Sequence, residues 1–505
     1  MSWEEGPFRF MSFKEWVPDK YRFAIYIILL LFFQFSNGMY FSAMAQMQGD
    51  KSITLNDVKM FSHAVLIGLT MFFPLAFRLK FYLTNKTCLM IAAIILTICN
   101  IIVPFIEQPF ILILIGFIAG FFRLFGTFEC FSSMLPKITP THNYATFLSF
   151  VFFIVLGVIH LFDVLCIQII YYYDWKYIHL LAIGLMLIVL LIAHVCMQDF
   201  RAMPKMPLYG IDWLGMILWS IFILSLIFIF QYGNQLEWFE SNYIRIATGA
   251  TLLSLGFNLA RMFHIRHPFI EPAAFKVRNL TNLLLTFLFL GILLASKNTL
   301  QNIFTGAVLH IDQLNTCKLK IAEFIGATIG SLFTWFALVR LKWSHKQLTF
   351  TGFVMIAIYV LSMYFLINLQ TGIEQLYFPL ICCSFGHLAI FISLTVYIQA
   401  SAPFKNYFQV LCILGFVRTG IASPIGDAIY QHGLTNLTNI HLEQINSIIP
   451  IDALLSAIQQ LYGYTFIFCI SILIILATTR FKKDVKKPIV GIKYIYKLTK
   501  DKIIN

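Results

Sequence analysis

Long apolar runs follow one another along this chain, and they restrict it to folds that a lipid bilayer can hold. Fourteen segments reach about 20 mostly apolar residues, the length that a membrane-spanning helix needs. Hydrophobic residues make up 59% of the 505 residues and charged residues 12%, against about 25% charged in a soluble domain. The sequence therefore predicts an all-α integral membrane protein with 14 transmembrane helices. The segments lie at residues 23–47, 59–77, 87–106, 109–134, 145–171, 177–197, 212–231, 243–263, 280–307, 316–340, 349–369, 375–401, 405–431 and 459–479.

The loops between these segments alternate in positive charge. Because lysine and arginine are enriched in cytoplasmic loops, the richer set predicts that both termini are cytoplasmic. The net charge of +13 then reflects topology and contact with anionic lipid, and we expect no nucleic-acid partner. The richer loops carry Arg78, Lys80 and Lys86, then Lys137, then Arg201 and Lys205, then Arg261, Arg266, Lys276 and Arg278, then Arg340, Lys342 and Lys346, then Lys405. The poorer loops carry Lys51, Lys59, Lys176, Lys318 and Lys320.

A basic phrase occurs twice, as FRLKFYLTNK from Phe77 to Lys86 and as VRLKWSHKQL from Val339 to Leu348. The first copy joins the second and third segments, and the other joins the second and third of the last six. Matched positions of this kind indicate two six-helix repeats with two additional helices between them. The alternative is that basic residues end many cytoplasmic helices without any repeat.

The repeat predicts a division of the chain into five parts. They are a cytoplasmic segment (1–22), a first six-helix bundle (23–197), two additional helices with linkers (198–279), a second six-helix bundle (280–479) and a basic cytoplasmic tail (480–505). Ten scattered cysteines form no CxxC pair, and the chain contains no Walker loop, zinc constellation or credible catalytic triad. We therefore expect no metal, no cofactor and no enzymatic activity.

Several motifs, taken in order, resemble those of the major facilitator superfamily, and in particular its fourteen-span drug:proton antiporter branch of the EmrB type. The first basic phrase stands where that superfamily has a Gly-x-x-x-Asp-Arg-x-Gly-Arg loop. The segment FIAGFFRLFGTFECF matches the span-four motif through Arg123 and Gly126, and VRTGIASPIGDAIY matches the span-thirteen motif through Arg418. The segments YGIDWLGMILWSIFILSLIFIFQYGNQLEWFES and HPFIEPAAFKVRN resemble the regions around span seven and before span nine.

Other positions depart from that pattern. The first basic phrase lacks the aspartate and the glycines of the superfamily loop. Span five reads VLGVIHLFDVLCIQII, with His160 and Asp163 where the branch has a Gly-Pro-rich motif, and span one offers Asn37 where the branch often has an aspartate. These differences leave proton exchange and the direction of transport open.

Ionisable side chains inside apolar segments are the main candidates for function, because a charge at membrane depth costs about 2.5–3.5 kcal/mol. Arg123 and Glu129 are about 120° apart on one helix, so we expect them to meet different partners. His160 and Asp163 are three residues apart, so they share a helix face and can exchange a proton near neutral pH, or simply steady the helix. The proton-coupling candidates are Arg123, Glu129, His160, Asp163 and Glu323.

Polar side chains in the apolar segments are also candidates for lining a substrate cavity, although Arg418 could instead brace the second half. We expect the two basic phrases to act as conformational-switch loops. The cavity candidates are Gln34, Asn37, Lys297, Gln301, His387 and Arg418, and the switch-loop candidates are Arg78, Lys80, Arg340 and Lys342.

The resemblance implies a secondary active transporter that exports lipophilic or amphipathic small molecules in exchange for protons, in the inner membrane of a bacterium. It also implies, for the EmrB type, a periplasmic adaptor and an outer-membrane channel as partners. A proton symporter, or a dedicated exporter or importer of one metabolite, is the alternative with the same fold. An alternative of another class is a membrane acyltransferase that uses His160, His310 or His387, but no His-acid motif of catalytic spacing stands in an interfacial loop.

Overall fold

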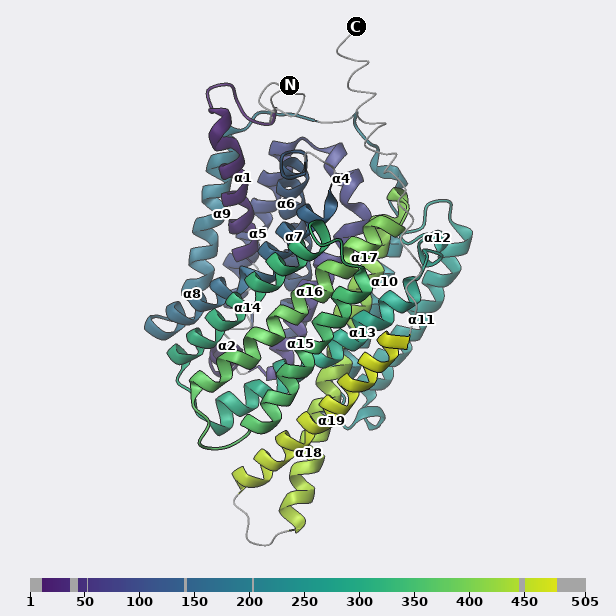
Figure 1. The fold of residues 1–505 in the computed structure, drawn as a ribbon. Helices are drawn as coiled ribbons and strands as arrows, with labels where there is room; N and C mark the ends of the chain where they lie inside the picture. Colours follow the sequence, from purple (N-terminus) through teal and green to yellow (C-terminus); the bar gives the residue numbers. More distant parts are fainter. Residues whose placement is uncertain are drawn as a thin grey trace.

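The computed structural model describes residues 11–36, 44–51, 53–139, 143–201, 204–444 and 450–478, and this part of the chain is almost entirely helical (Figure 1). Within it, thirteen helices are long and apolar enough to cross a membrane, one fewer than predicted. The difference arises in the first predicted segment, 23–47. Helix α1 (Asp19–Phe35) has 17 residues, and the short helix α2 (Met44–Lys51) is separate from it. The predicted residue Asn37 lies outside the described residues.

The long helices fall in chain order into a first group, a middle pair and a last group. The first group is α1, α3 (Leu55–Phe72) with α4 (Ala76–Tyr82), α5 (Asn85–Ile102), α6 (Pro109–Ile138), α7 (Tyr144–Phe152) with α8 (Ile159–Tyr172), and α9 (Lys176–Cys196). The middle pair is α10 (Trp213–Tyr232) and α11 (Asn242–His264), followed by the short α12 (Pro272–Phe275). The last group is α13 (Leu280–Ser296), α14 (Gln313–Val339), α15 (His345–Leu366), α16 (Tyr377–Ser401), α17 (Phe404–Gly415) with α18 (Ser423–Gln444), and α19 (Pro450–Thr478).

The first and last groups use the same helix pairings. The second helix packs along the fourth in both, as α3 on α6 and α14 on α16. The third packs along the sixth, as α5 on α9 and α15 on α19. The helices of the two groups are thus paired alike.

Glycines allow the closest of these contacts. A Cβ atom at Gly120 of α6 would lie 1.8 Å from the carbonyl oxygen of Val65 on α3, and one at Gly326 of α14 would lie 2.4 Å from that of Ile381 on α16. Since membrane helices associate mainly through close packing, small residues at these crossings bring the backbones together. The equivalent helix pairs in the two groups are therefore joined in the same way.

The two groups meet through a reciprocal contact. Helix α3, the second of the first group, packs on α17 and the turn after it, which belong to the fifth position of the last group. Conversely, α7 and α8, the fifth position of the first group, pack on α14, the second of the last group. An approximate twofold axis between the two groups produces this pattern. The second helix of each group then packs against the fifth helix of the other group.

The middle pair lies beside this interface rather than between the groups. Helix α10 packs on α11, and it also contacts α3 of the first group and α18 of the last group. Trp219 of α10 stacks on Phe416 at 5.4 Å, and Gln231 donates a hydrogen bond to Asn56 at 2.9 Å. Helix α11 exposes apolar side chains such as Leu252 and Phe257, which suits a helix that faces lipid.

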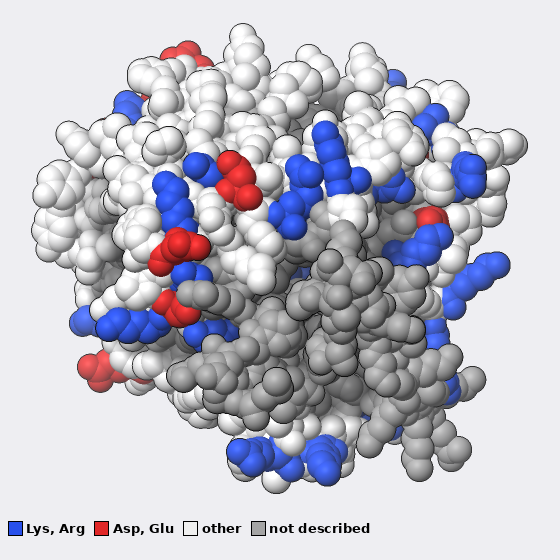
Figure 2. Space-filling model, turned by 90° about the horizontal axis from the view of Figure 1, so that it is seen from above, with Lys and Arg blue, Asp and Glu red and all other residues white. Residues whose placement is uncertain are grey.

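The predicted cation-rich loops gather at one end of the molecule, which we call the basic end. It includes α4, the start of α17 and the region of α12, at the top of Figure 1. Figure 2 looks onto this end and shows many more lysine and arginine side chains than acidic ones. Contacts between successive loops hold it together, such as Lys405 with Glu271 at 2.9 Å and Arg261 with Asp212 at 2.6 Å.

Candidate functional site

Five ionisable side chains from both helix groups form one cluster, which we call the interface cluster: His160, Asp163, Lys297, Lys320 and Glu323. Glu323 of α14 is at its centre and is 1% exposed. Its carboxylate lies 2.7 Å from Lys297 Nζ, 3.3 Å from Lys320 Nζ and 2.9 Å from His160 Nδ1. The last of these contacts joins α14 to α8 and so bridges the two groups.

Asp163 of α8 makes a looser set of contacts in the same cluster. Its carboxylate is 3.7 Å from Lys320 Nζ and 3.9 Å from His160 Nδ1. The predicted neighbourhood of His160 and Asp163 on one helix face is present, but His160 lies closer to Glu323 of the other group than to Asp163. Lys320 was counted among the cations of the poorer loops, although the predicted segment 316–340 contains it; it is part of α14 one turn before Glu323 and faces α8.

The cluster is balanced in charge only when its histidine is neutral. Two carboxylates face two lysines, and protonation of His160 or of either carboxylate leaves an excess positive charge. Buried ion pairs cost several kcal/mol per ion in desolvation, and losing one partner is therefore costly, about 3–5 kcal/mol. In order of magnitude, opposite charges about 4 Å apart attract by about 4 kcal/mol at the effective dielectric constant of a protein near its surface. The change in interaction energy when the cluster takes up a proton is therefore large enough to alter how tightly α8 and α14 associate.

Wide helical turns carry several of the predicted residues. Lys297 and Gln301 lie in a π-helical turn, Lys297–Gln301, and Arg418 lies in another, Phe416–Ala422. His160 follows a third, Phe153–Gly157. Such turns are rare and concentrate at functional sites, because the extra residue turns a side chain to a new direction. They place polar side chains of α8, α13 and α17 toward the interface.

Arg123 has a different environment from Glu129, as their separation on α6 predicts. Arg123 donates a hydrogen bond from Nη2 to Gln34 Oε1 at 2.6 Å, and Gln34 in turn donates to Thr127 at 3.0 Å. Its Nε atom is buried and has no hydrogen-bond partner in the described residues. Two predicted residues, Arg123 and Gln34, are thus brought together within the first group.

Glu129 is paired with Lys80, a residue that the sequence analysis placed in a switch loop. Lys80 Nζ lies 3.3 Å from the Glu129 carboxylate and also contacts Ser132, while Ser133 donates to Glu129 at 3.2 Å. The Lys80 side chain is therefore buried against α6 and does not lie at the surface. Arg78 stays near the surface and donates to the carbonyl oxygen of Pro207 at 3.5 Å.

The second basic phrase has no matching arrangement. Arg340 and Lys342 are both exposed, and Lys342 has a left-handed backbone conformation with φ of 53°. The two phrases that look alike in sequence therefore lie in different surroundings, one partly buried and one at the surface.

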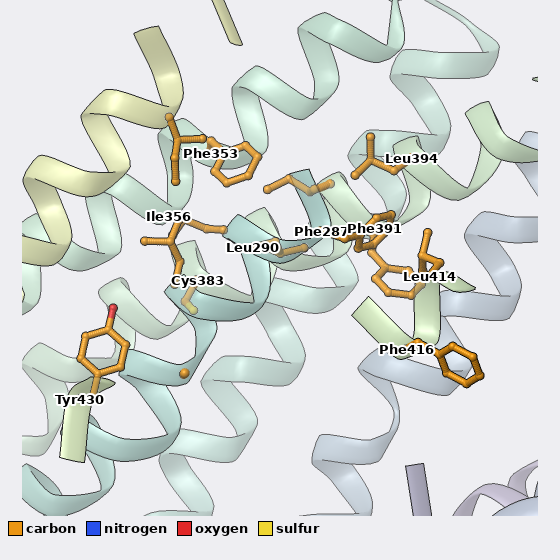
Figure 3. Close-up of a cluster of buried hydrophobic side chains, with 14 of the residues drawn as sticks. Phe287, Leu290, Phe353, Ile356, Cys383, Phe391, Leu394, Leu414, Phe416 and Tyr430 are labelled. Carbon is orange, nitrogen blue, oxygen red and sulfur yellow. The ribbon is translucent and has the colours of Figure 1, made fainter. Parts of the chain in front are cut away.

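The remaining cavity candidates lie in the last group. Gln301 accepts a hydrogen bond from Tyr359 at 3.2 Å. The guanidinium of Arg418 lies over the ring of Phe391, 4.5 Å from its centre, and His387 is one helical turn before Phe391 on α16. Figure 3 shows Phe391 with Phe287, Leu414 and Phe416 in one apolar cluster.

Aromatic side chains join the two groups near the basic end. Phe77 of α4 meets Phe404 at 5.1 Å and Phe408 at 4.7 Å, and Phe408 also lies 5.5 Å from Phe128 of α6. The interface is therefore apolar at the basic end and ionic towards the opposite end. The aromatic contacts could not be found from sequence, because phenylalanine occurs 53 times and most copies face lipid or other helices.

Two cavities lie away from these contacts. One, of about 260 Å³, is open at the start of α15 beside Trp343, Lys346 and Phe350. The other, of about 100 Å³, lies between α13 and α19. Neither includes a residue of the interface cluster.

No family model and no curated protein matches the sequence, but solved structures match the fold. An auto-inhibited peptide transporter of the POT family has a TM-score of 0.56 and 12% identity over 92% of this chain and 98% of its own. A mutant of the nucleoside transporter NupG has a TM-score of 0.57 and 11% identity over 90% and 100%. A structure described as giving insight into substrate recognition in proton dependent oligopeptide transporters has a TM-score of 0.58 and 13% identity over 91% and 97%. The chain therefore shares its all-helical fold with these transporters.

Proposed function

We propose that the chain is a secondary active transporter that couples the movement of a small molecule to that of protons. The two units that move would be the predicted bundles, 23–197 and 280–479, with α10 and α11 attached at the side. The observation that carries the proposal is the interface cluster, because it ties titratable groups of α8 to those of α14 across the contact between the two units. The transporter fold of the solved structures supports the same reading.

The cluster suggests how a proton would be linked to movement. Opening the interface at the end opposite the basic end requires His160 and Asp163 to leave Lys320 and Glu323. The ionic contacts of Asp163, at 3.7 Å and 3.9 Å, are longer than those of Glu323, so we assign the mobile proton to Asp163 and expect Glu323 to stay ionised between its lysines. Protonated Asp163 no longer attracts Lys320, and the state with this end open becomes more populated.

The aromatic contacts would form the opposite gate. Both ends are closed in this structure. When the ionic end opens by rocking, Phe77 and Phe408 would stay packed, and when these rings separate the ionic end would stay closed, which exposes a central site to one side of the membrane at a time. Arg78 and Lys80 would support this movement at the basic end.

The direction of transport rests on the sequence resemblance. It favours the fourteen-span antiporter branch, with both termini in the cytoplasm of a bacterium and export of lipophilic or amphipathic compounds against proton entry. An adaptor and an outer-membrane channel would then complete the path. Proton symport is the alternative, favoured by the unusual residues of span five, His160 and Asp163.

The test is transport into proteoliposomes with an imposed pH gradient. The probes are two fluorescent compounds of fixed charge, 1-naphthalenesulfonate and (1-naphthylmethyl)trimethylammonium. The wild type should move at least one of them only when the gradient is present, and the sign separates exchange from symport. Asp163→Asn should abolish the dependence on the gradient, whereas Asp312→Asn, an exposed aspartate at the start of α14, should not. Gradient-driven transport that survives in Asp163→Asn would remove this residue from the mechanism.

A further inference from the structure

Among the described residues of the membrane interior, three buried acidic side chains have cationic partners and a fourth, Asp427, accepts a hydrogen bond from Thr299, but two arginines have no acidic partner. Glu129 is matched by Lys80, and Asp163 and Glu323 are matched by Lys297 and Lys320. In the described residues, no carboxylate lies within 4.0 Å of Arg123 or of Arg418. The positive charges of these two arginines therefore have to be stabilised in another way.

Arg123 and Arg418 differ in how they are held. Arg123 is bonded to Gln34 and is 3% exposed, so it is closed off within the first group. Arg418 has no hydrogen bond to a described residue and is only partly buried, in the last group near the interface. The ring of Phe391 is its close neighbour, and a cation over an aromatic face is stabilised by about 2 kcal/mol at most when desolvated. That is less than the cost of a buried charge, so the site is incomplete.

His387, which also lies beside Phe391, is a second polar side chain without a hydrogen-bond partner for one of its atoms in the described residues. Its Nε2 atom is buried and has no hydrogen-bond partner among the described residues. The imidazole lies edge-on to Phe391, with 6.2 Å between the ring centres. The Arg418 guanidinium and the His387 Nε2 atom thus lie beside one phenyl ring, and neither has a hydrogen-bond partner in the part of the chain that the structure describes; with its proton on Nε2, His387 adds a second donor to that of Arg418.

The surroundings of this pair are aromatic and come from both units. Phe391 lies 4.7 Å from Phe152 of α7 and 5.4 Å from Phe287 of α13. Figure 3 shows the position of Phe391 relative to Phe287. Any molecule that reaches Arg418 would therefore rest its apolar part on these rings. Phe152 belongs to the first group, so such a molecule would touch both moving units at once.

We propose that the transported molecule is an amphipathic organic anion, and that Arg418 and His387 bind its oxyanion while Phe391, Phe287 and Phe152 contact its apolar body. Arginine suits this role because its planar N–H fork matches the oxygen atoms of a carboxylate, sulfonate or phosphate. That the bound anion is also transported rests on the proposed function, whereas its binding at this site does not. It narrows the expected lipophilic or amphipathic substrates to those with a negative charge.

The binding test uses the purified full chain in uncharged detergent with phosphatidylcholine. 1-Naphthalenesulfonate should raise its unfolding temperature in a saturable way, and (1-naphthylmethyl)trimethylammonium, with the same ring system and the opposite charge, should not. Arg418→Gln should weaken binding of the sulfonate by about tenfold or more, since it removes a charge-assisted hydrogen bond. Arg418→Lys should retain part of the affinity, and Arg266→Gln, an exposed arginine, should retain all of it.

Each outcome decides between the proposals. Stabilisation by the cation, or equal stabilisation by the sulfonate in the wild type and Arg418→Gln, overturns the anion site. If Arg418→Gln does not fold, the contrast between the two probes in the wild type still decides. Stabilisation by phosphatidylglycerol that depends on Arg418, with no effect of the sulfonate, assigns the site to a lipid headgroup and also overturns it. Sulfonate binding without gradient-driven transport of either probe preserves the site and contradicts the proposed function instead.

Discussion

At the scale of single residues, the environment of each buried charged side chain is set by its ionic partners on other helices. His160 and Asp163 were found from sequence because they are three residues apart on one helix. The convergence of Lys297, Lys320 and Glu323 on them could not be found, because spacing reports the face of a helix and not the neighbour of that face. The role of Lys320 was missed for a related reason, since a lysine near a helix end counts as a topology signal until its partners are known.

Lys80 and Glu129 provide a test at this scale. Lys80→Gln would leave Glu129 buried without a cation, and we expect it to lower the free energy of unfolding by about 3–5 kcal/mol. The double variant Lys80→Gln with Glu129→Gln should recover most of this loss, because no charge then remains unpaired. Thermal unfolding can be followed with a thiol-reactive dye, since all ten cysteines are free and all but Cys196 are buried.

The matched control is Lys86→Gln, in the same basic phrase, which should have little effect. A Lys80→Gln variant as stable as the wild type would mean that the ion pair contributes nothing. A double variant no better than the single one would mean that the loss comes from Lys80 packing and not from charge.

At the scale of helices, hydropathy and length located nearly every element, because the bilayer demands them. The exceptions are instructive. The first segment was predicted as one span, yet α1 ends at Phe35 and α2 is a separate short helix. The π-helical turns at Lys297–Gln301 and Phe416–Ala422 were not predicted, since a shift of hydrogen bonding by one residue leaves no trace in composition.

Gly120 tests the contact between α3 and α6. Gly120→Ala would place a Cβ atom 1.8 Å from the backbone oxygen of Val65, so the two helices have to separate. We expect a loss of about 1–3 kcal/mol in the free energy of unfolding, the usual cost of overpacking. Gly256→Ala on α11 is the control, because nothing lies within 4 Å of its Cβ position. Equal stability of the two variants in the dye assay would refute the close contact.

At the scale of the whole molecule, the predicted repeat and the observed packing agree in kind. The two basic phrases pointed to two similar units, and the helix pairings are the same in the first and last groups. The phrases themselves turned out to have unlike surroundings, with Lys80 buried and Lys342 exposed. Similar basic phrases in the sequence therefore do not indicate equivalent local structure. The different ends of the interface, one aromatic and one ionic, were visible only in three dimensions.

The central claim is that protonation of the interface cluster releases α8 from α14. It is tested most directly by the distance between spin labels at Tyr172→Cys on α8 and Lys318→Cys on α14, both exposed positions, measured by pulsed electron paramagnetic resonance. In the wild type we expect a short distance between the two labels at about pH 8 and a longer one at about pH 5. When Asp163 is changed to Asn, we expect the longer distance at both pH values. The same distance distribution in the wild type at both pH values and in the variant would contradict it.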